Sequence, residues 1–97
     1  MVGRVRARDF GVVLGDLEKG DLNAITDVEG VGVGHSTVIS GDDVRTGVTA
    51  IVPHQGNPFE DKVIAAVDLF NAYGKATGLP QIMFEGVLEV PIMLTET

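Results

Sequence analysis

The 97-residue sequence has no cysteine and no tryptophan, only 5% aromatic residues, and only two histidines, His35 and His54. Without cysteine the chain cannot form a disulfide or a cysteine-ligated zinc site, and two histidines are too few for a self-contained metal centre. A domain of this length hides only about 60–65% of the surface that its unfolded chain exposes. We therefore expect no metal or other cofactor, and a domain with little stability of its own.

Long apolar runs and basic residues are also scarce. The apolar run at residues 10–14 (FGVVL) is too short for the core of a signal peptide, and no stretch approaches the ~18 apolar residues of a membrane span. After Arg8 the chain carries four basic against fourteen acidic side chains, a formal charge of −10. Nucleic-acid binding needs clustered Lys and Arg. We expect a soluble cytoplasmic protein that binds neither nucleic acid nor membrane.

Thirteen glycines separate runs of β-branched residues, a pattern typical of a sheet protein. Residues 30–39 (GVGVGHSTVI) and 44–52 (VRTGVTAIV) each have the composition of a strand. The polar segment at residues 40–43 (SGDD) between them has the composition of a turn. The sequence therefore predicts a β-hairpin.

Two further apolar segments follow the predicted hairpin. Residues 62–70 (KVIAAVDLF) are predicted to form a strand buried on both faces, although their periodicity also allows a helix. Residues 91–97 (PIMLTET) have the apolar content of a strand interior without a continuation. Chain ends of intact domains are usually polar or frayed, so we expect an incomplete domain.

None of the local motifs predicts a catalytic centre. The run at residues 30–34 (GVGVG) lacks the following helix that a dinucleotide-binding loop needs, so its glycines are interpreted as allowing close strand packing. His35 and His54 are interpreted as hydrogen-bonded structural residues. The only serines, Ser36 and Ser40, do not lie in a GxSxG nucleophile turn.

Taken in order, five segments resemble the DmpA-like aminopeptidases, the L-aminopeptidase/D-esterase and β-peptidyl aminopeptidase family. The resemblance covers essentially the whole chain. Its segments are residues 6–11 (RARDFG), 22–35 (LNAITDVEGVGVGH), 44–51 (VRTGVTAI), 71–78 (NAYGKATG) and 91–95 (PIMLT).

The resemblance implies an α+β fold, the β-rich portion of an αββα sandwich of the DmpA type, incomplete in this chain. Residues 1–97 would be the N-terminal part of the α subunit. Such enzymes are made as a precursor that cuts itself before a serine, which becomes an N-terminal nucleophile and forms an acyl-enzyme. That serine is expected beyond Thr97, on a companion chain. The assembled unit is expected to be a homo-oligomer that acts on small peptide or amide substrates.

The resemblance also suggests which residues face the substrate. An aminopeptidase must recognise a free ammonium group, and a carboxylate near the scissile bond can do so. Glu96, at the end of the last predicted strand, is therefore predicted to bind substrate, with Asn71 and Tyr73 lining the pocket. Asn23 and Asp27 are predicted to fix the backbone through hydrogen bonds from side chain to main chain.

Two other functions remain open at this stage. A non-catalytic binding or assembly module could retain the family's β-framework without its chemistry. An acyltransferase could pass the acyl group to an amine instead of water.

Overall fold

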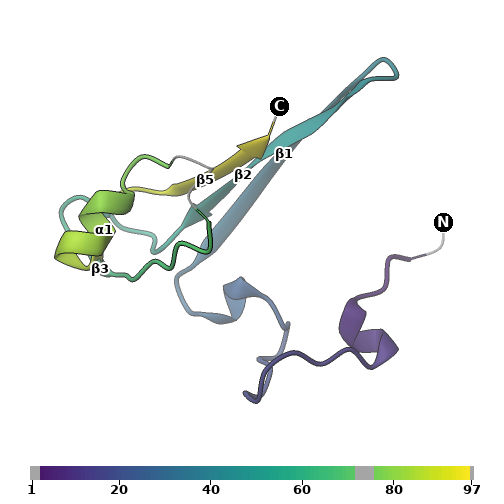
Figure 1. Cartoon of the computed structure of the whole chain (residues 1–97), viewed down its shortest axis with the longest axis horizontal. Helices are drawn as coiled ribbons and strands as arrows, with labels where there is room; N and C mark the ends of the chain where they lie inside the picture. The colour runs from purple at the N-terminus through teal and green to yellow at the C-terminus, as the bar shows by residue number, and fades with distance from the viewer. Residues whose placement is uncertain (1–2, 72–75, 97) are drawn as a thin grey trace.

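The computed structural model describes residues 3–71 and 76–96 and shows a small mixed α/β structure with two antiparallel sheets (Figure 1). One sheet has three strands in the order β1-β2-β5, and the other pairs β3 with β4. The elements in chain order are η1 (Ala7–Phe10), η2 (Ile25–Asp27), β1 (Gly32–Ser40), β2 (Val44–Val52), β3 (Val63–Ile64), α1 (Leu79–Glu85), β4 (Val87–Leu88) and β5 (Ile92–Glu96), where η marks a 3-10 helix.

The predicted hairpin is confirmed by β1 and β2. They pair without interruption from Gly32 opposite Val52 to Ser40 opposite Val44. The turn contains Gly41 at φ +60°, and the Arg45 guanidinium donates hydrogen bonds to the Gly41 and Val44 carbonyl oxygens at 2.8 and 2.7 Å. These bonds tie the arginine to the turn, and the tip of the hairpin projects beyond β5 (Figure 1).

The glycines before the hairpin serve different purposes. Gly30 has φ +88°, a conformation that residues with a side chain rarely adopt. A Cβ on Gly32 would lie 3.4 Å from the Gln55 amide nitrogen, whereas a Cβ on Gly34 would meet nothing within 4 Å. The interpretation of close strand packing is therefore wrong for Gly34.

The segment at residues 62–70 does not form the predicted buried strand. Only Val63 and Ile64 pair with β4, while the side chains of Ile64 and Phe70 are 91% and 97% exposed. A strand buried on both faces needs partners along its edges and a layer on each side. The described residues supply one two-residue partner, so most of this apolar segment stays unpaired.

The helix α1 was not predicted from the sequence. It follows Gly78, which has φ +92°, and contains Pro80 in its first turn. It ends at Gly86, which has φ +70° and donates its N–H to the Ile82 carbonyl at 2.9 Å. Proline near the start and glycine just after the end are the usual signals of a helix, here compressed into one short segment.

The loop after β2 is held by His54. Its Nδ1 accepts the Gly56 N–H at 2.9 Å, so the ring proton lies on Nε2, which donates to the Asp61 carbonyl at 2.7 Å. Gln55 donates to the Gly30 carbonyl at 3.1 Å and fastens the same loop to the start of β1. The interpretation of His54 as a hydrogen-bonded structural residue is confirmed.

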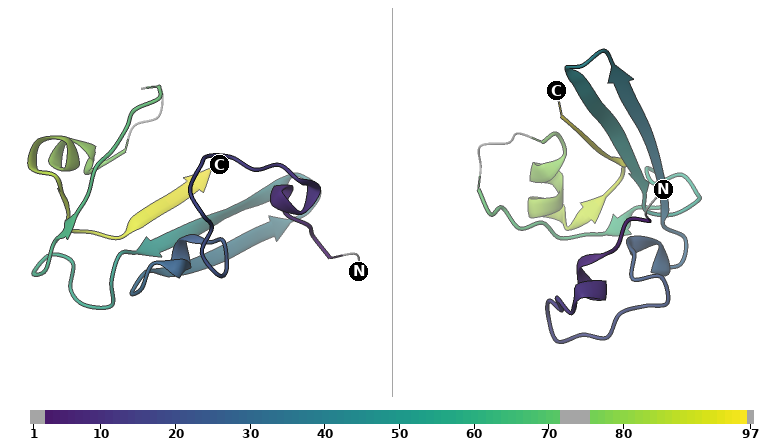
Figure 2. Two further views of the ribbon diagram at one scale, coloured as in Figure 1. Left: turned by 90° about the horizontal axis from the view of Figure 1, so that it is seen from below. Right: turned by 90° about the vertical axis from the view of Figure 1, so that its right-hand side faces the viewer.

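The N-terminal arm, residues 3–22, curves away from the sheets (Figure 2). It is anchored by Arg6, whose guanidinium donates to the Leu22 and Asn23 carbonyl oxygens at 2.6 and 2.9 Å. Leu14 and Leu17 on this arm are 85% and 90% exposed. The arm is therefore held by polar bonds to the backbone, and its apolar side chains face solvent.

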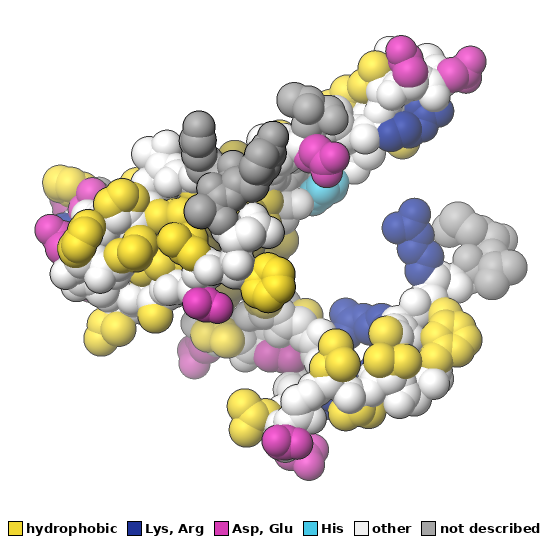
Figure 3. Space-filling view, viewed as in Figure 1, with side chains coloured by type: hydrophobic (Ala, Val, Ile, Leu, Met, Phe, Trp, Pro, Cys, Tyr) yellow, Lys and Arg dark blue, Asp and Glu magenta, His cyan; other side chains and the backbone are white. Residues whose placement is uncertain are grey.

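Hydrophobic side chains are exposed over much of the molecular face shown in Figure 3. Among the described residues only Leu88, on β4, is buried, at 8% exposure. None of the described helices has the length and hydropathy needed to cross a membrane.

Candidate functional site

The predicted substrate-binding residue Glu96 is the last residue of β5. It lies opposite Gly47 in β2, at the end of a register that begins with Ile92 opposite Ile51. Two hydroxyl groups fix this end of the strand, because Thr95 donates to the Gly47 carbonyl at 2.8 Å and Thr46 donates to the Glu96 carbonyl. The Glu96 backbone is thus held in place while its side chain is exposed.

His35 and Glu96 lie on the same face of the three-stranded sheet. Directly paired residues of an antiparallel sheet share a face, and alternate residues of one strand share it too. One row across the sheet is Thr37, Gly47 and Glu96; the neighbouring row is His35, Thr49 and Leu94. The pairing therefore places an imidazole, a hydroxyl and a carboxylate side by side.

The ring of His35 is held within this group. Its Nδ1 lies 2.6 Å from the Thr49 hydroxyl oxygen. A Cβ on Gly47 would be 3.1 Å from His35 Nε2, so the ring lies over Gly47. The interpretation of His35 as a hydrogen-bonded residue is confirmed, but sequence spacing did not reveal that it shares a face with Glu96.

The carboxylate of Glu96 is available for a cationic ligand. In the described ranges the one ion pair joins Lys62 to Glu89, at 3.7 Å, and does not involve Glu96. Arg45, which lies on the same face two residues before Gly47, is occupied by its bonds to the turn. An exposed carboxylate without a basic partner can accept hydrogen bonds from an ammonium group.

The other two predicted pocket residues add less to this site. Asn71 lies exposed at the end of the extended segment that follows β3. Tyr73 lies outside the described residues. Their predicted role beside Glu96 stays a prediction.

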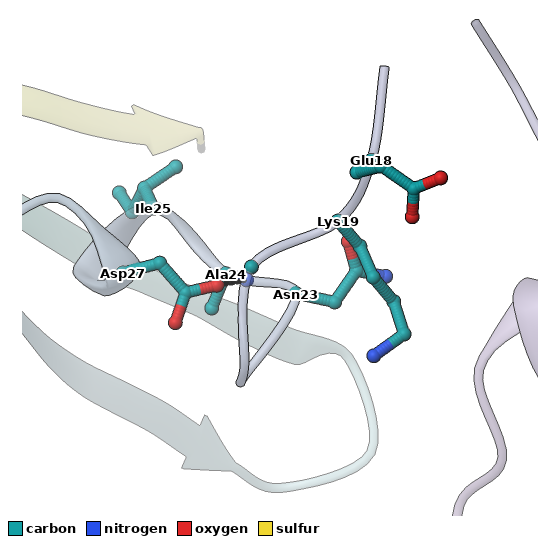
Figure 4. A pocket seen from close by; sticks show the side chains of 7 residues that line it. Glu18, Lys19, Asn23, Ala24, Ile25 and Asp27 are labelled. Carbon is teal, nitrogen blue, oxygen red and sulfur yellow. Dashed lines mark hydrogen bonds between the residues drawn. The ribbon is translucent and has the colours of Figure 1, made fainter. Parts of the chain in front are cut away.

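A separate open hollow of about 420 Å³ lies in the segment before β1 (Figure 4). Figure 4 shows the Asp27 side chain turned toward the backbone near Ala24, with Glu18 pointing away. Asp27 accepts the N–H groups of Leu22 and Ala24 at 3.0 and 3.2 Å, which confirms its predicted backbone role.

Asn23 contributes to this hollow in a different way from the prediction. It has φ +50°, a left-handed conformation that asparagine tolerates better than most residues. Its carbonyl oxygen accepts a hydrogen bond from Arg6 at 2.9 Å. Its side chain makes no hydrogen bond with the described residues, so its contribution is the conformation of its backbone.

The hydrogen bonds to Asp27 make this segment sensitive to acid. The Leu22 N–H, followed by the N–H groups of Ala24 and Asn23, lowers the pKa of Asp27 below its ordinary value of 3.8. A lowered pKa stabilises the fold above the unfolded value, and that stabilisation is lost as the pH falls through the folded value. We expect Asp27→Asn to lower the Tm of the assembled protein at pH 7, with the difference from wild type shrinking below pH 3.8.

Thermal unfolding measured at several pH values between 7 and 3 would check this expectation. Asp21→Asn is the matched control, since Asp21 is an exposed neighbour without a hydrogen bond to the described residues. A Tm difference for Asp27→Asn that is equal at pH 7 and pH 3 would contradict the assignment.

Within residues 3–71 and 76–96, no group of three histidine or acidic side chains is arranged to hold a metal ion. The sheet face described above carries a carboxylate, an imidazole and hydroxyl groups.

Most of the chain, including the sheet that carries Glu96, matches one known protein family. Residues 23–97 match the family described as peptidase family S58, and the chain belongs to that family. This match, together with the relatives below, confirms the resemblance to the DmpA-like aminopeptidases.

Two curated relatives are named beta-peptidyl aminopeptidase BapA. The chain is 41% identical to the protein of Sphingosinicella microcystinivorans, and the match covers 95% of this chain and 25% of that relative. It is 46% identical to the protein of Sphingosinicella xenopeptidilytica, and the match covers 95% of this chain and 24% of that relative. The chain thus spans about a quarter of the length of these relatives.

A solved structure has the same fold over this region. The chain resembles the PH0078 protein from Pyrococcus horikoshii OT3 with a TM-score of 0.86 and 44% sequence identity. The match covers 96% of this chain and 29% of that protein. The arrangement of strands described here is therefore also part of a much longer polypeptide.

Proposed function

We propose that residues 1–97 form the N-terminal part of a self-processing serine aminopeptidase that removes N-terminal residues from peptides, amides or esters. The observation that carries the proposal is the 41% and 46% identity to two beta-peptidyl aminopeptidases over 95% of the chain. The chain's own serines do not serve as the nucleophile. Thr37 is the β1 residue on the same face as Glu96, and Ser36 and Ser40 lie an odd number of residues from it. Both serines therefore lie on the opposite face of the sheet.

In this proposal the nucleophile is the N-terminal serine of a companion polypeptide. Its α-amino group takes the proton from its own hydroxyl, and the oxygen attacks the scissile carbonyl carbon. The α-ammonium group gives this proton to the leaving amine or alcohol as its bond to the carbonyl carbon breaks, and an ester to serine forms. Water then hydrolyses this acyl-enzyme, which releases the acid and restores the serine hydroxyl. Glu96 binds the substrate's ammonium group and so places the adjacent carbonyl carbon near the serine.

The companion polypeptide also completes the fold. Val33 and Leu94 on one face of the three-stranded sheet, and Val38 and Met93 on the other, are between 47% and 60% exposed. A sheet with apolar residues on both faces requires a covering layer on each. We propose that further chain supplies these layers and produces an αββα sandwich, which then assembles as a homo-oligomer.

The proposal is tested on the protein that is purified after expression of its native gene together with the adjacent coding sequence. Intact mass analysis is expected to show this chain together with a polypeptide that begins with serine or threonine. The preparation is expected to hydrolyse aminoacyl p-nitroanilides with a free amino group and to leave their N-acetylated forms intact. A preparation of the 10.2 kDa chain alone that hydrolyses these substrates would contradict the proposal.

The role of Glu96 has its own test in the assembled enzyme. A charged hydrogen bond contributes about 1.5–3 kcal/mol, so Glu96→Gln is expected to raise KM for free-amine substrates by about tenfold or more. The change in kcat is expected to be smaller, because the ammonium group is bound before and during the reaction. Steady-state kinetics measure both values.

Glu85→Gln is the matched control for this substitution. Glu85 is exposed on α1 and has no hydrogen bond or ion pair with the described residues. Unchanged kinetics for Glu96→Gln would remove Glu96 from the substrate site.

A further inference from the structure

The neighbour of Glu96 across Gly47 is the ring of His35. The ring belongs to the row of Thr49 but leans over Gly47, because its Nε2 lies 3.1 Å and its Cε1 3.3 Å from where a Cβ of Gly47 would be. Among the described residues Nε2 has no hydrogen-bond partner. Only the absence of a side chain at position 47 leaves this space open.

Glu96 is the next residue across the sheet from that space. Paired Cβ atoms of an antiparallel sheet lie about 4.5–5.5 Å apart, so the Cβ of Glu96 is about one strand spacing from the Gly47 position. Rotation of the glutamate side chain brings its carboxylate within reach of Nε2, directly or through one water molecule. The two groups therefore face each other across a glycine.

The hydroxyl of Thr49 is hydrogen-bonded to one ring nitrogen of His35 and leaves the other nitrogen for Glu96. Thr49 Oγ1 lies 2.6 Å from His35 Nδ1. When this hydroxyl donates to Nδ1, the proton of the neutral ring lies on Nε2 and points toward the row of Glu96. With this direction of the bond, Thr49 orients His35 as a hydrogen-bond donor toward the carboxylate.

An imidazole N–H suits a carboxylate that must bind a cation. A lysine or arginine beside Glu96 would compete with the substrate's ammonium group, and Arg45, the basic residue on this face, is held at the turn. An imidazole N–H can occupy one carboxylate oxygen and leave the negative charge and the second oxygen for the substrate.

We propose that His35, oriented by Thr49 and admitted by Gly47, is a positioning residue that fixes the Glu96 carboxylate for the substrate's ammonium group. The proposal rests on the proposed function of Glu96. It names the group that donates a hydrogen bond to Glu96, the Nε2 of His35. It also gives a role to the space above Gly47, through which the ring reaches the carboxylate.

The first test uses the assembled enzyme and a double-mutant cycle between His35→Ala and Glu96→Gln. Loss of one hydrogen bond is expected to raise KM for a free-amine p-nitroanilide about fivefold, with kcat changed less than about twofold. In the Glu96→Gln background, His35→Ala is expected to change KM no further. His35→Gln, which retains an amide donor, is expected to restore part of the affinity, and Ser40→Ala, on the opposite face of β1, is the control.

The second test does not depend on activity. The ring nitrogen resonances of His35, observed by ¹⁵N NMR of the assembled protein, are expected to show a proton on Nε2 and to shift in Glu96→Gln. Unchanged resonances would overturn the proposal. Independent, multiplying effects of His35→Ala and Glu96→Gln on KM would also overturn it while leaving the role of Glu96 intact. If Glu96→Gln leaves KM unchanged, the proposed function of Glu96 fails, and the role of His35 fails with it.

Discussion

Expressed alone, the 97-residue chain is expected to bind a hydrophobic dye and to show no cooperative thermal unfolding. Its accessible surface is 8558 Å². A folded monomer of 10.2 kDa is expected to expose only about 5,300 Å². Its radius of gyration is 16.4 Å, against about 12.5 Å for a compact domain of this length.

This shortfall in burial is large compared with the stability of a domain. Apolar burial contributes about 25 cal/mol per Å², so about 500 Å² is equivalent to most of the roughly 5–15 kcal/mol by which a typical domain is stable. The excess surface is about 3,000 Å² relative to the compact expectation. The hydrogen bonds that link β1 to β2 and that anchor the N-terminal arm are worth only about 1 kcal/mol each in net terms.

Circular dichroism during heating, dye fluorescence and size-exclusion chromatography together check this expectation. Adding the companion polypeptide, by co-expression, is expected to suppress dye binding and to produce one sharp transition. A soluble monomer of the isolated chain with a sharp transition would instead favour the non-catalytic module that the sequence left open.

The parts of the fold that were predicted correctly depend on neighbouring residues. The hairpin of β1 and β2 has its strand composition and its turn within 21 consecutive residues, Gly32–Val52. The prediction of a buried strand at residues 62–70 was wrong because such a strand needs partner strands from elsewhere in the chain. The described residues supply only β4 as a partner. The helix α1 was missed although Pro80 and Gly86 marked its ends, because seven residues are too few for a hydrophobic period to be recognised.

The site was predicted less completely than the fold, for a related reason. Glu96 was chosen from a resemblance and from the chemistry of ammonium recognition, and the structure places it at a strand end. Its neighbourhood could not be read from the sequence, because the pairing of Gly47 with Glu96 joins residues 49 positions apart. Once that register is known, the period of two places His35 and Glu96 on the same face.

Gly47→Ala is expected to be among the most damaging single substitutions in this chain. The new Cβ would lie 2.5 Å from the Ser36 carbonyl oxygen, a backbone atom of the paired strand. It would also press against the His35 ring. Relieving the contact requires β1 and β2 to separate, and overpacking of this kind costs about 1–3 kcal/mol.

The same substitution is expected to affect substrate binding as well as stability. A methyl group between His35 and Glu96 occupies the space through which the ring reaches the carboxylate. We expect the assembled enzyme to lose Tm and to show a raised KM for free-amine substrates, measured by thermal unfolding and steady-state kinetics.

Gly34→Ala distinguishes this effect from a general intolerance of side chains in the hairpin. Gly34 lies in the same hairpin, but a Cβ there meets nothing within 4 Å, and its backbone is not left-handed. Replacing such a glycine by alanine is expected to change stability by less than about 1 kcal/mol, because it mainly restricts the unfolded chain. Equal losses in both variants would contradict the argument, since only position 47 combines a close backbone atom with the ring of His35. A loss of Tm confined to Gly47→Ala would show that the Ser36 carbonyl oxygen and the His35 ring together exclude a side chain at position 47. A rise in KM for free-amine substrates that exceeds the rise in Gly34→Ala is the result expected if this space also serves the contact between His35 and Glu96.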